Sequence, residues 1–125
     1  MALEKCKLLI EVNKFGRPGF VQSRACEPLD IYLADQGLNY FRHVLPLPDY
    51  GMIILDEILV AIDFGLLKER ALCEVLKMRP IHMHVVLTGR NASKRILDMA
   101  DLVTDMKELK HPYKEGVKAQ IGIEY

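Results

Sequence analysis

Apolar residues along the chain form short runs that alternate with longer segments of helical spacing. The short runs predict β-strands, at Lys7–Val12, Met52–Leu55, His82–Leu87 and Leu102–Met106. The longer segments predict helices, over Pro28 to about Leu45, over Leu66–Met78, and after Asn91, which would cap a helix with Ile96, Leu97 and Ala100 on its core face. Strands that alternate with such helices predict an α/β fold with a mostly parallel sheet.

Length and composition limit the function classes. The 125 residues fit a single α/β domain spanning residues 1–125. Equal numbers of basic and acidic residues, 17 each, give no electrostatic reason to expect nucleic acid or an anionic membrane as partner. The three cysteines, Cys6, Cys26 and Cys73, have no disulfide or zinc spacing, and no apolar run reaches about 18 residues. We therefore expect a reduced, soluble, cytoplasmic protein.

The first candidate site is an acidic pair at the end of an apolar strand. Met52–Leu55 is apolar at every position, which predicts a strand covered on both faces, and Asp56 and Glu57 follow it directly. This is the Walker B pattern, in which one or two carboxylates suffice for a nucleotide's Mg²⁺ because the ion keeps several waters. The alternative is an acidic start of the next segment, or solvated charge.

The second candidate is Thr88-Gly89-Arg90, which follows the strand at His82–Leu87. Ligands of parallel sheets bind beyond the carboxyl ends of the strands. Here an arginine pairs well with phosphate oxygens, and a glycine lets the backbone approach closely. The alternative is an ordinary turn between strand and helix with an exposed arginine.

The third candidate is the aromatic loop, defined here as Phe15–Phe20. Two glycines and a proline prevent regular structure, while Phe15 and Phe20 could lie against a large flat ligand and Arg17 offers charge. The alternative, in which both aromatic rings pack into the core, remains open. A phosphate loop, G-x-x-x-x-G-K-[ST], is not present, because none of the eight glycines is followed by lysine.

Several segments together resemble the ATP:corrinoid adenosyltransferase family. The resemblance is collinear from about Phe15 to Tyr125. It is carried by Ile53–Ile58, Val60–Leu67, His84–Asn91, Ala100–Thr104, His111–Tyr113 and Gly116–Tyr125. It implies a P-loop-type fold, Mg-ATP as adenosyl donor, and a reduced corrinoid, cob(I)alamin or cob(I)yrinic acid a,c-diamide, as acceptor. The cobalt(I) centre attacks the 5′ carbon of the ribose and triphosphate leaves. The enzyme would be a cytoplasmic transferase of cobalamin biosynthesis.

Residue roles also follow from the resemblance. Asp56 and Glu57 would serve the metal, and Thr88, Gly89 and Arg90 the nucleotide. The aromatic loop, with Phe15, Arg17 and Phe20, would serve the corrinoid. No residue of the chain is predicted to be catalytic in the sense of forming or breaking bonds, because the corrinoid itself supplies the nucleophile.

The chain departs from the family's pattern at its start. Family members begin with a strand, a phosphate loop, its helix and a second strand, and this sequence starts after them. We therefore expect an unpaired edge at Met52–Leu55 and weak or absent ATP binding by these residues alone. Either the chain is a truncated relative that acts as a homo-oligomer such as a dimer, or a P-loop-bearing partner chain supplies the rest. The second reading makes it a non-catalytic corrinoid-binding subunit.

Overall fold

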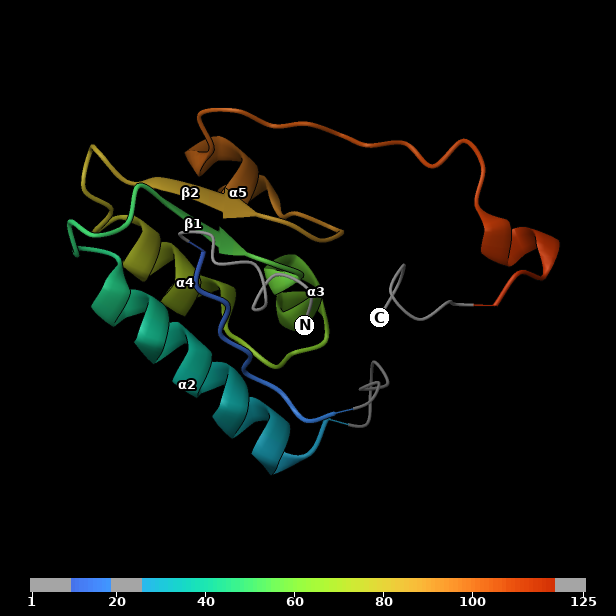
Figure 1. Cartoon of the computed structure of the whole chain (residues 1–125), viewed down its shortest axis with the longest axis horizontal. Helices are drawn as coiled ribbons and strands as arrows, with labels where there is room; N and C mark the ends of the chain where they lie inside the picture. Colours follow the sequence, from blue (N-terminus) through green and yellow to red (C-terminus); the bar gives the residue numbers. More distant parts are fainter. Residues whose placement is uncertain (1–9, 19–25, 119–125) are drawn as a thin grey trace. The chain divides into compact units, whose positions relative to one another are not determined.

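The computed structural model describes residues 10–18 and 26–118 (Figure 1). The chain divides into two compact units, one of residues 14–99 and one that joins residues 1–13 to 100–125. The larger unit contains, in chain order, α2 (Pro28–Val44), β1 (Met52–Leu55), α3 (Ile58–Asp63), α4 (Glu69–Leu76), β2 (His84–Leu87) and α5 (Lys94–Met99). The organisation of residues 1–125 as one domain stays a prediction.

The sheet of the larger unit consists of two parallel strands. Met52 lies opposite His84, and Leu55 lies opposite Leu87. The connection between the strands carries α3 and α4, so the unit contains a β–α–β arrangement, as parallel neighbours require. The predicted α/β class with parallel strands is therefore confirmed at this level.

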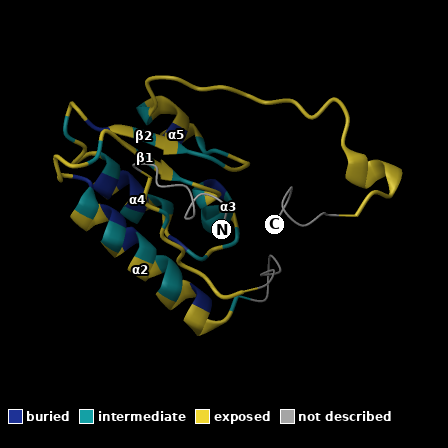
Figure 2. Cartoon of the chain, viewed as in Figure 1, coloured by how far each residue is buried: buried dark blue, intermediate teal, exposed yellow. Residues whose placement is uncertain are grey.

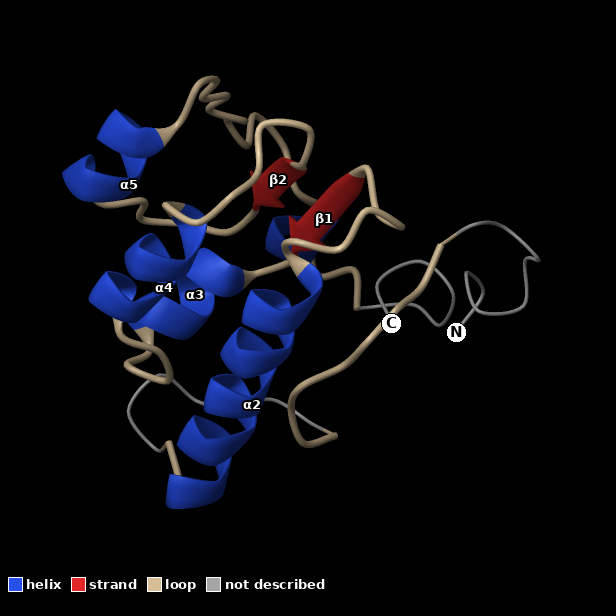
Figure 3. Ribbon diagram, turned by 90° about the vertical axis from the view of Figure 1, so that its left-hand side faces the viewer, coloured by secondary structure: helices blue, strands red, loops and turns tan. Residues whose placement is uncertain are grey.

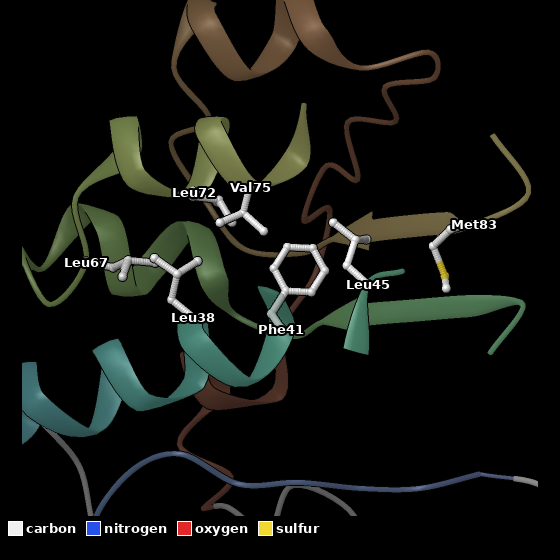
Figure 4. Close-up of a cluster of buried hydrophobic side chains, with 7 residues drawn as sticks. All are labelled: Leu38, Phe41, Leu45, Leu67, Leu72, Val75 and Met83. Atoms are coloured by element: carbon white, nitrogen blue, oxygen red, sulfur yellow. The ribbon is translucent and has the colours of Figure 1, made fainter. Parts of the chain in front are cut away.

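The core of the larger unit lies between the helices and one face of the sheet. Its buried side chains come from α2, α4 and the segments that flank the strands, and Figure 4 shows them converging: Leu38, Phe41, Leu45, Leu67, Leu72, Val75 and Met83. Helix α2 begins at Pro28, whose fixed φ suits a first helical turn, and joins this core through an apolar stripe in its C-terminal half that contains Leu38 and Phe41. Burial of this stripe stabilises the helix against α4 and the sheet.

Only one face of the sheet is covered by described residues. Ile53, Leu55, Val85 and Leu87 pack against the core, whereas Met52 and Ile54 are 55% and 60% exposed. Figure 3 shows the helices of this unit gathered on one side of the strands, and Figure 2 shows the exposed positions. The prediction that Met52–Leu55 is covered on both faces is therefore wrong for this structure. The run is apolar throughout, but the helices supply neighbours for only one of its faces.

Several boundaries differ from those that the sequence predicts. The helix expected over Leu66–Met78 is shorter, because α4 spans Glu69–Leu76. The strand expected from His82 begins at His84. The six-residue helix α3 was not predicted, since only one of its residues, Leu59, is buried and its periodicity is weak.

Asn91 does not cap α5. Its backbone has φ +58°, and its side-chain amide donates to Asp63 Oδ2 at 3.3 Å. The hydroxyl of Ser93 instead accepts from the backbone N–H of Ile96 at 3.3 Å, immediately before the helix begins at Lys94. The cap therefore lies two residues later than predicted.

Two predicted strands are not found. Residues 10–12 of the run Lys7–Val12 have no strand structure, and residues 7–9 lie outside the described residues. Leu102–Met106 also has no strand structure, and Leu102 and Met106 are 84% and 89% exposed. An apolar run becomes a strand only where another strand pairs with its backbone, and the described part of the smaller unit contains none.

The tail of the chain is mostly irregular, as predicted, in the part that the structure describes. It contains one short 3₁₀ helix, η1 (Pro112–Glu115), which ends at Gly116 with φ +81°. Residues 119–125 lie outside the described residues. Among the described helices, none combines the length and the apolar character needed to cross a membrane.

Candidate functional site

The ends of the two parallel strands bring two of the predicted clusters together. Asp56 and Glu57 follow β1, and Thr88 follows β2. The backbone N–H of Thr88 donates to the carbonyl of Leu55 at 3.2 Å, which extends the strand pairing by one step. Parallel strands end at the same edge of a sheet, so residues 32 positions apart become neighbours there.

The side chain of Thr88 links the acidic pair to this edge. Its hydroxyl donates to Asp56 Oδ1 at 2.7 Å and accepts from the backbone N–H of Glu57 at 2.8 Å. The carbonyl of Thr88 accepts from the backbone N–H of Leu59, the second residue of α3, at 3.2 Å. Thr88 therefore holds Asp56 and the start of α3 in one arrangement.

Both carboxylates remain available to a ligand. Asp56 and Glu57 are exposed. Among the described residues, Asp56 Oδ2 and the Glu57 carboxylate have no hydrogen-bond or ion-pair partner. Glu57 has left-handed backbone, with φ +57° and ψ +21°, which costs a non-glycine residue about 1 kcal/mol or more. The backbone is thus locally strained at Glu57, in the acidic pair that directly follows β1.

The backbone conformation at residue 89 and its close packing require a glycine, which the sequence alone does not reveal. Its φ is +135°, and an added Cβ would lie 2.7 Å from Leu59 Cβ and 3.1 Å from the backbone nitrogen of Val60. The close approach that only glycine allows is therefore to α3. Arg90 follows in an exposed position and has no ion-pair partner among the described residues.

The described part of the aromatic loop, residues 15–18, contacts α2. The Phe15 ring lies 5.4 Å from the Tyr40 ring, centroid to centroid, at an interplanar angle of 40°. Arg17 pairs with Asp30 and Glu27 at the start of α2, at 2.7 Å and 3.0 Å. Phe20 lies outside the described residues. The roles of Phe15, Arg17 and Phe20 toward a corrinoid stay predictions.

The cysteines of the larger unit do not resemble nucleophiles. Cys73 is 4% exposed, and burial raises the pKa of its thiol, which disfavours the reactive thiolate. Cys26 donates its thiol to the carbonyl of Phe64 at 3.3 Å. Both observations agree with the interpretation of these cysteines as core or incidental residues.

The donor set at the strand ends suits a magnesium ion carried by a nucleotide better than a resident metal. No group of three or more metal-binding side chains occurs among the described residues. Mg²⁺ needs only one or two carboxylates when substrate phosphates and waters complete its shell. Asp56 Oδ2 and the Glu57 carboxylate provide that number, so the residues present fit such an ion.

Sequence reasoning missed the connections within this site. The sequence placed Asp56 and Thr88 at one edge, because both follow predicted parallel strands. It did not reveal that the Thr88 hydroxyl binds both Asp56 and the backbone of Glu57, because a threonine at a strand end has many possible partners. One signal would have indicated these hydrogen bonds: a hydroxyl residue directly follows one strand, and an acidic residue directly follows the neighbouring parallel strand.

Comparison with known proteins identifies the family. The family model described as ATP:corrinoid adenosyltransferase BtuR/CobO/CobP matches residues 1–125. The chain belongs to this family. A corrinoid adenosyltransferase of Sinorhizobium sp. is 35% identical over 108 residues, which are 86% of this chain and 50% of that protein. The Pseudomonas aeruginosa corrinoid adenosyltransferase is 37% identical over 108 residues, 86% of this chain and 53% of the relative.

A third member shows the same partial coverage. The corrinoid adenosyltransferase CobA of Salmonella typhimurium is 37% identical over 84 residues, 67% of this chain and 43% of that protein. The chain thus spans about half the length of the curated relatives it matches. The resemblance inferred from the sequence motifs is confirmed as membership of the ATP:corrinoid adenosyltransferase family.

Replacing Thr88 tests the link between the two strand ends. Thr88→Val keeps the shape of the side chain but removes both hydroxyl hydrogen bonds, so we expect a loss of about 1 kcal/mol in the free energy of unfolding. Urea denaturation measures it. Thr88→Ser should restore most of the loss, and Thr104→Val, at an exposed threonine, should change stability by less than about 0.5 kcal/mol. Equal stability of Thr88→Val and the wild type would contradict the link.

Asp30 gives the chain a predictable response to acid. The hydrogen bonds from Arg17, then that from the backbone of Glu27, lower the pKa of the Asp30 carboxyl below its usual value. Because the folded-state pKa is lowered, this contribution to stability is complete above the unfolded-state pKa of about 3.9 and is lost as the pH falls below it. Urea midpoints at pH 6 and pH 3 should therefore show a difference between wild type and Asp30→Asn that shrinks at pH 3. A constant difference would contradict this.

Proposed function

We propose that this chain acts in ATP:corrinoid adenosyl transfer and supplies the side of the active site that faces the nucleotide's magnesium. The reaction moves the 5′-deoxyadenosyl group of ATP to the cobalt of a reduced corrinoid in cobalamin biosynthesis or salvage. The C5′–O bond breaks, a Co–C bond forms with the electron pair of cobalt(I), and triphosphate leaves. One observation carries the assignment of the site: the hydrogen-bonded set of Asp56, Thr88 and the Glu57 backbone at the strand ends.

Each residue at this edge has a role that its contacts support. Thr88 orients Asp56 so that Oδ2 is free, and the carboxylate of the next residue, Glu57, is exposed. These two oxygen donors would hold the Mg²⁺ of the nucleotide, and the ion would neutralise charge on the departing triphosphate. Arg90, on the turn after β2, would contact phosphate oxygens through its planar fork. Gly89 keeps that turn against α3.

The fold that this function implies is also part of the proposal. An apolar strand that ends in two acidic residues and pairs with a parallel strand is typical of P-loop NTPase-like sheets. In these sheets a phosphate loop holds the triphosphate. The 125 residues contain no such loop motif. We therefore expect the 125-residue chain to bind the corrinoid and the magnesium ion of the nucleotide, and another polypeptide segment to hold the phosphates.

Calorimetry tests this division of roles. Mg-ATP and a corrinoid are titrated separately into the purified 125-residue chain. Weak or undetectable ATP binding together with corrinoid binding is the expected result. ATP binding at micromolar affinity would contradict the need for an additional phosphate loop, and failure to bind any corrinoid would contradict the assignment to corrinoid chemistry.

A second candidate function is a non-catalytic corrinoid-binding subunit that pairs with a P-loop-bearing chain. The exposed apolar side chains of Met52 and Ile54 on β1 favour it, because such a strand invites association. Substitution of Glu57 by Gln separates the two proposals in a reconstituted system that contains a phosphate-loop segment. Loss of Mg-dependent transfer supports the catalytic proposal, and unchanged transfer supports the subunit.

A further inference from the structure

All three guanidinium nitrogens of Arg17 donate to residues at the N-terminus of α2. Nε donates to Asp30 Oδ1 at 2.7 Å, Nη2 donates to Asp30 Oδ2 at 2.7 Å, and Nη1 donates to Glu27 Oε2 at 3.0 Å. The first two bonds form a two-pronged arginine–carboxylate pair, which fixes direction as well as distance. The arginine that the sequence offers to a ligand is therefore already held by two carboxylates of its own chain.

The carboxylate that receives this pair is buried. The Asp30 side chain is 3% exposed, whereas that of Glu27 is 62% exposed. Asp30 Oδ2 also accepts the backbone N–H of Glu27 at 2.9 Å, the residue directly before α2. A buried carboxylate without its cation is strongly unfavourable, so the Arg17–Asp30 pair resists exchange with a ligand's charge. Glu27 is the weaker, exchangeable contact.

A second contact fixes the loop farther along the same helix. An added Cβ on Gly37 would lie 3.1 Å from both Cβ and Cγ of Phe15, so the ring side chain lies directly against the helix backbone there. The Phe15 ring also lies beside Tyr40. Gly37 and Asp30 are two helical turns apart, about 10 Å along the axis. The described part of the loop, residues 15–18, is thus attached to α2 at two separated points.

We propose that Arg17 is a positioning residue, which fixes residues 15–18 on α2 before any corrinoid binds and does not itself contact the corrinoid. The inference rests on the proposed function only for the identity of the ligand. It gives Arg17 a role different from the ligand contact that the sequence suggests. Phe15 remains 41% exposed, so the fixed loop presents part of an aromatic ring.

A ligand-contacting Arg17 and a loop-fixing Arg17 should affect the binding of two corrinoids differently. Cobyrinic acid a,c-diamide carries carboxylates at positions where cobalamin carries amides. If Arg17 touched the ligand, its removal would weaken binding of the carboxylate-bearing corrinoid more. If Arg17 fixes the loop, its removal weakens both corrinoids equally, and removing the buried partner Asp30 has the same effect.

Corrinoid affinities of the 125-residue chain test the proposal. We expect Arg17→Met and Asp30→Asn each to weaken both corrinoids by about tenfold, the cost of ordering a loop on binding. Arg17→Lys should recover part of the loss, because lysine keeps the charge but not the two-pronged geometry. Lys14→Met, at an exposed neighbouring cation of the loop, should stay within about twofold of wild type, since a single exposed charge contributes little. Selective loss of the carboxylate-bearing corrinoid in Arg17→Met, with Asp30→Asn unaffected, would overturn the proposal.

An independent measurement separates this proposal from the proposed function. The Arg17 Nε–H resonance in an NMR spectrum should exchange slowly with water in the free protein and become fast in Asp30→Asn. Exchange as fast as in a free arginine would overturn the proposal even if corrinoid binds. Absence of corrinoid binding by the wild type would instead overturn the proposed function, and the Nε–H exchange would still decide whether Arg17 is held. Circular dichroism confirms that Asp30→Asn retains its helices.

Discussion

If Asp56 holds the nucleotide's magnesium as proposed, replacing it by asparagine is expected to reduce adenosyl transfer by about a hundredfold or more, because the ion loses one of its carboxylate ligands. The change keeps the size of the side chain, and the amide oxygen can still accept from Thr88. The loss should therefore appear in the rate and not in the fold. Glu57→Gln should give a loss of similar size.

The measurement is the rate of adenosylation of a chemically reduced corrinoid in a reconstituted system that supplies a phosphate-loop segment. Asp49→Asn is the matched control, since Asp49 is an exposed aspartate that precedes β1 and does not lie at the carboxyl ends of the strands. It should leave the rate within about twofold, as expected for a solvated surface charge. Full activity of Asp56→Asn at low Mg²⁺ would remove Asp56 from the metal side.

Gly89→Ala is expected to destabilise the chain by about 2 to 4 kcal/mol, because it combines backbone strain with overpacking. The φ of +135° is a region that L-residues rarely adopt. The new methyl group would also lie 2.7 Å from Leu59 Cβ, so α3 or the turn must move. Since Leu59 N–H bonds to the Thr88 carbonyl, this movement would also disturb the acidic edge.

Urea denaturation with Gly51→Ala as control tests this expectation. Gly51 directly precedes β1, and an added Cβ there meets no atom within 4 Å. Gly51→Ala should therefore change the free energy of unfolding by less than about 0.5 kcal/mol. A Gly89→Ala variant as stable as Gly51→Ala would show that the turn after β2 is not packed as described.

The sequence pattern predicted α2 and β1 well, although β1 contains no fully buried residue. Helix α2 appeared within one residue of its predicted bounds, and β1 matched fully, because α2 carries apolar residues at helical spacing and β1 is an unbroken apolar run with one face against the core. Helix α3 was missed since a single buried leucine leaves no stripe to detect. The strand predicted at Leu102–Met106 failed because apolar residues alone do not supply a pairing partner.

The sequence predicted which residues lie at the same edge of the sheet, but not which atoms contact one another there. Parallel topology was enough to place Asp56 and Thr88 at one edge of the sheet. The use of the Thr88 hydroxyl, the packing of Gly89 on α3, and the capture of Arg17 by Asp30 depend on atomic distances between residues that are 13 to 32 positions apart. Such distances follow from the tertiary fold, and no local pattern encodes them.

We propose that Asp56 and Glu57 face the metal of a bound nucleotide. Paramagnetic broadening by Mn²⁺, which replaces Mg²⁺ at oxygen sites, tests it in the 125-residue chain even when binding is weak. In an NMR titration of Mn²⁺ with ATP present, we expect the amide signals of residues 55–58 and 88–90 to broaden first, and the double variant Asp56→Asn/Glu57→Gln to lose this selectivity. If other acidic residues broadened first, or if the double variant broadened like the wild type, Asp56 and Glu57 would not be the metal ligands.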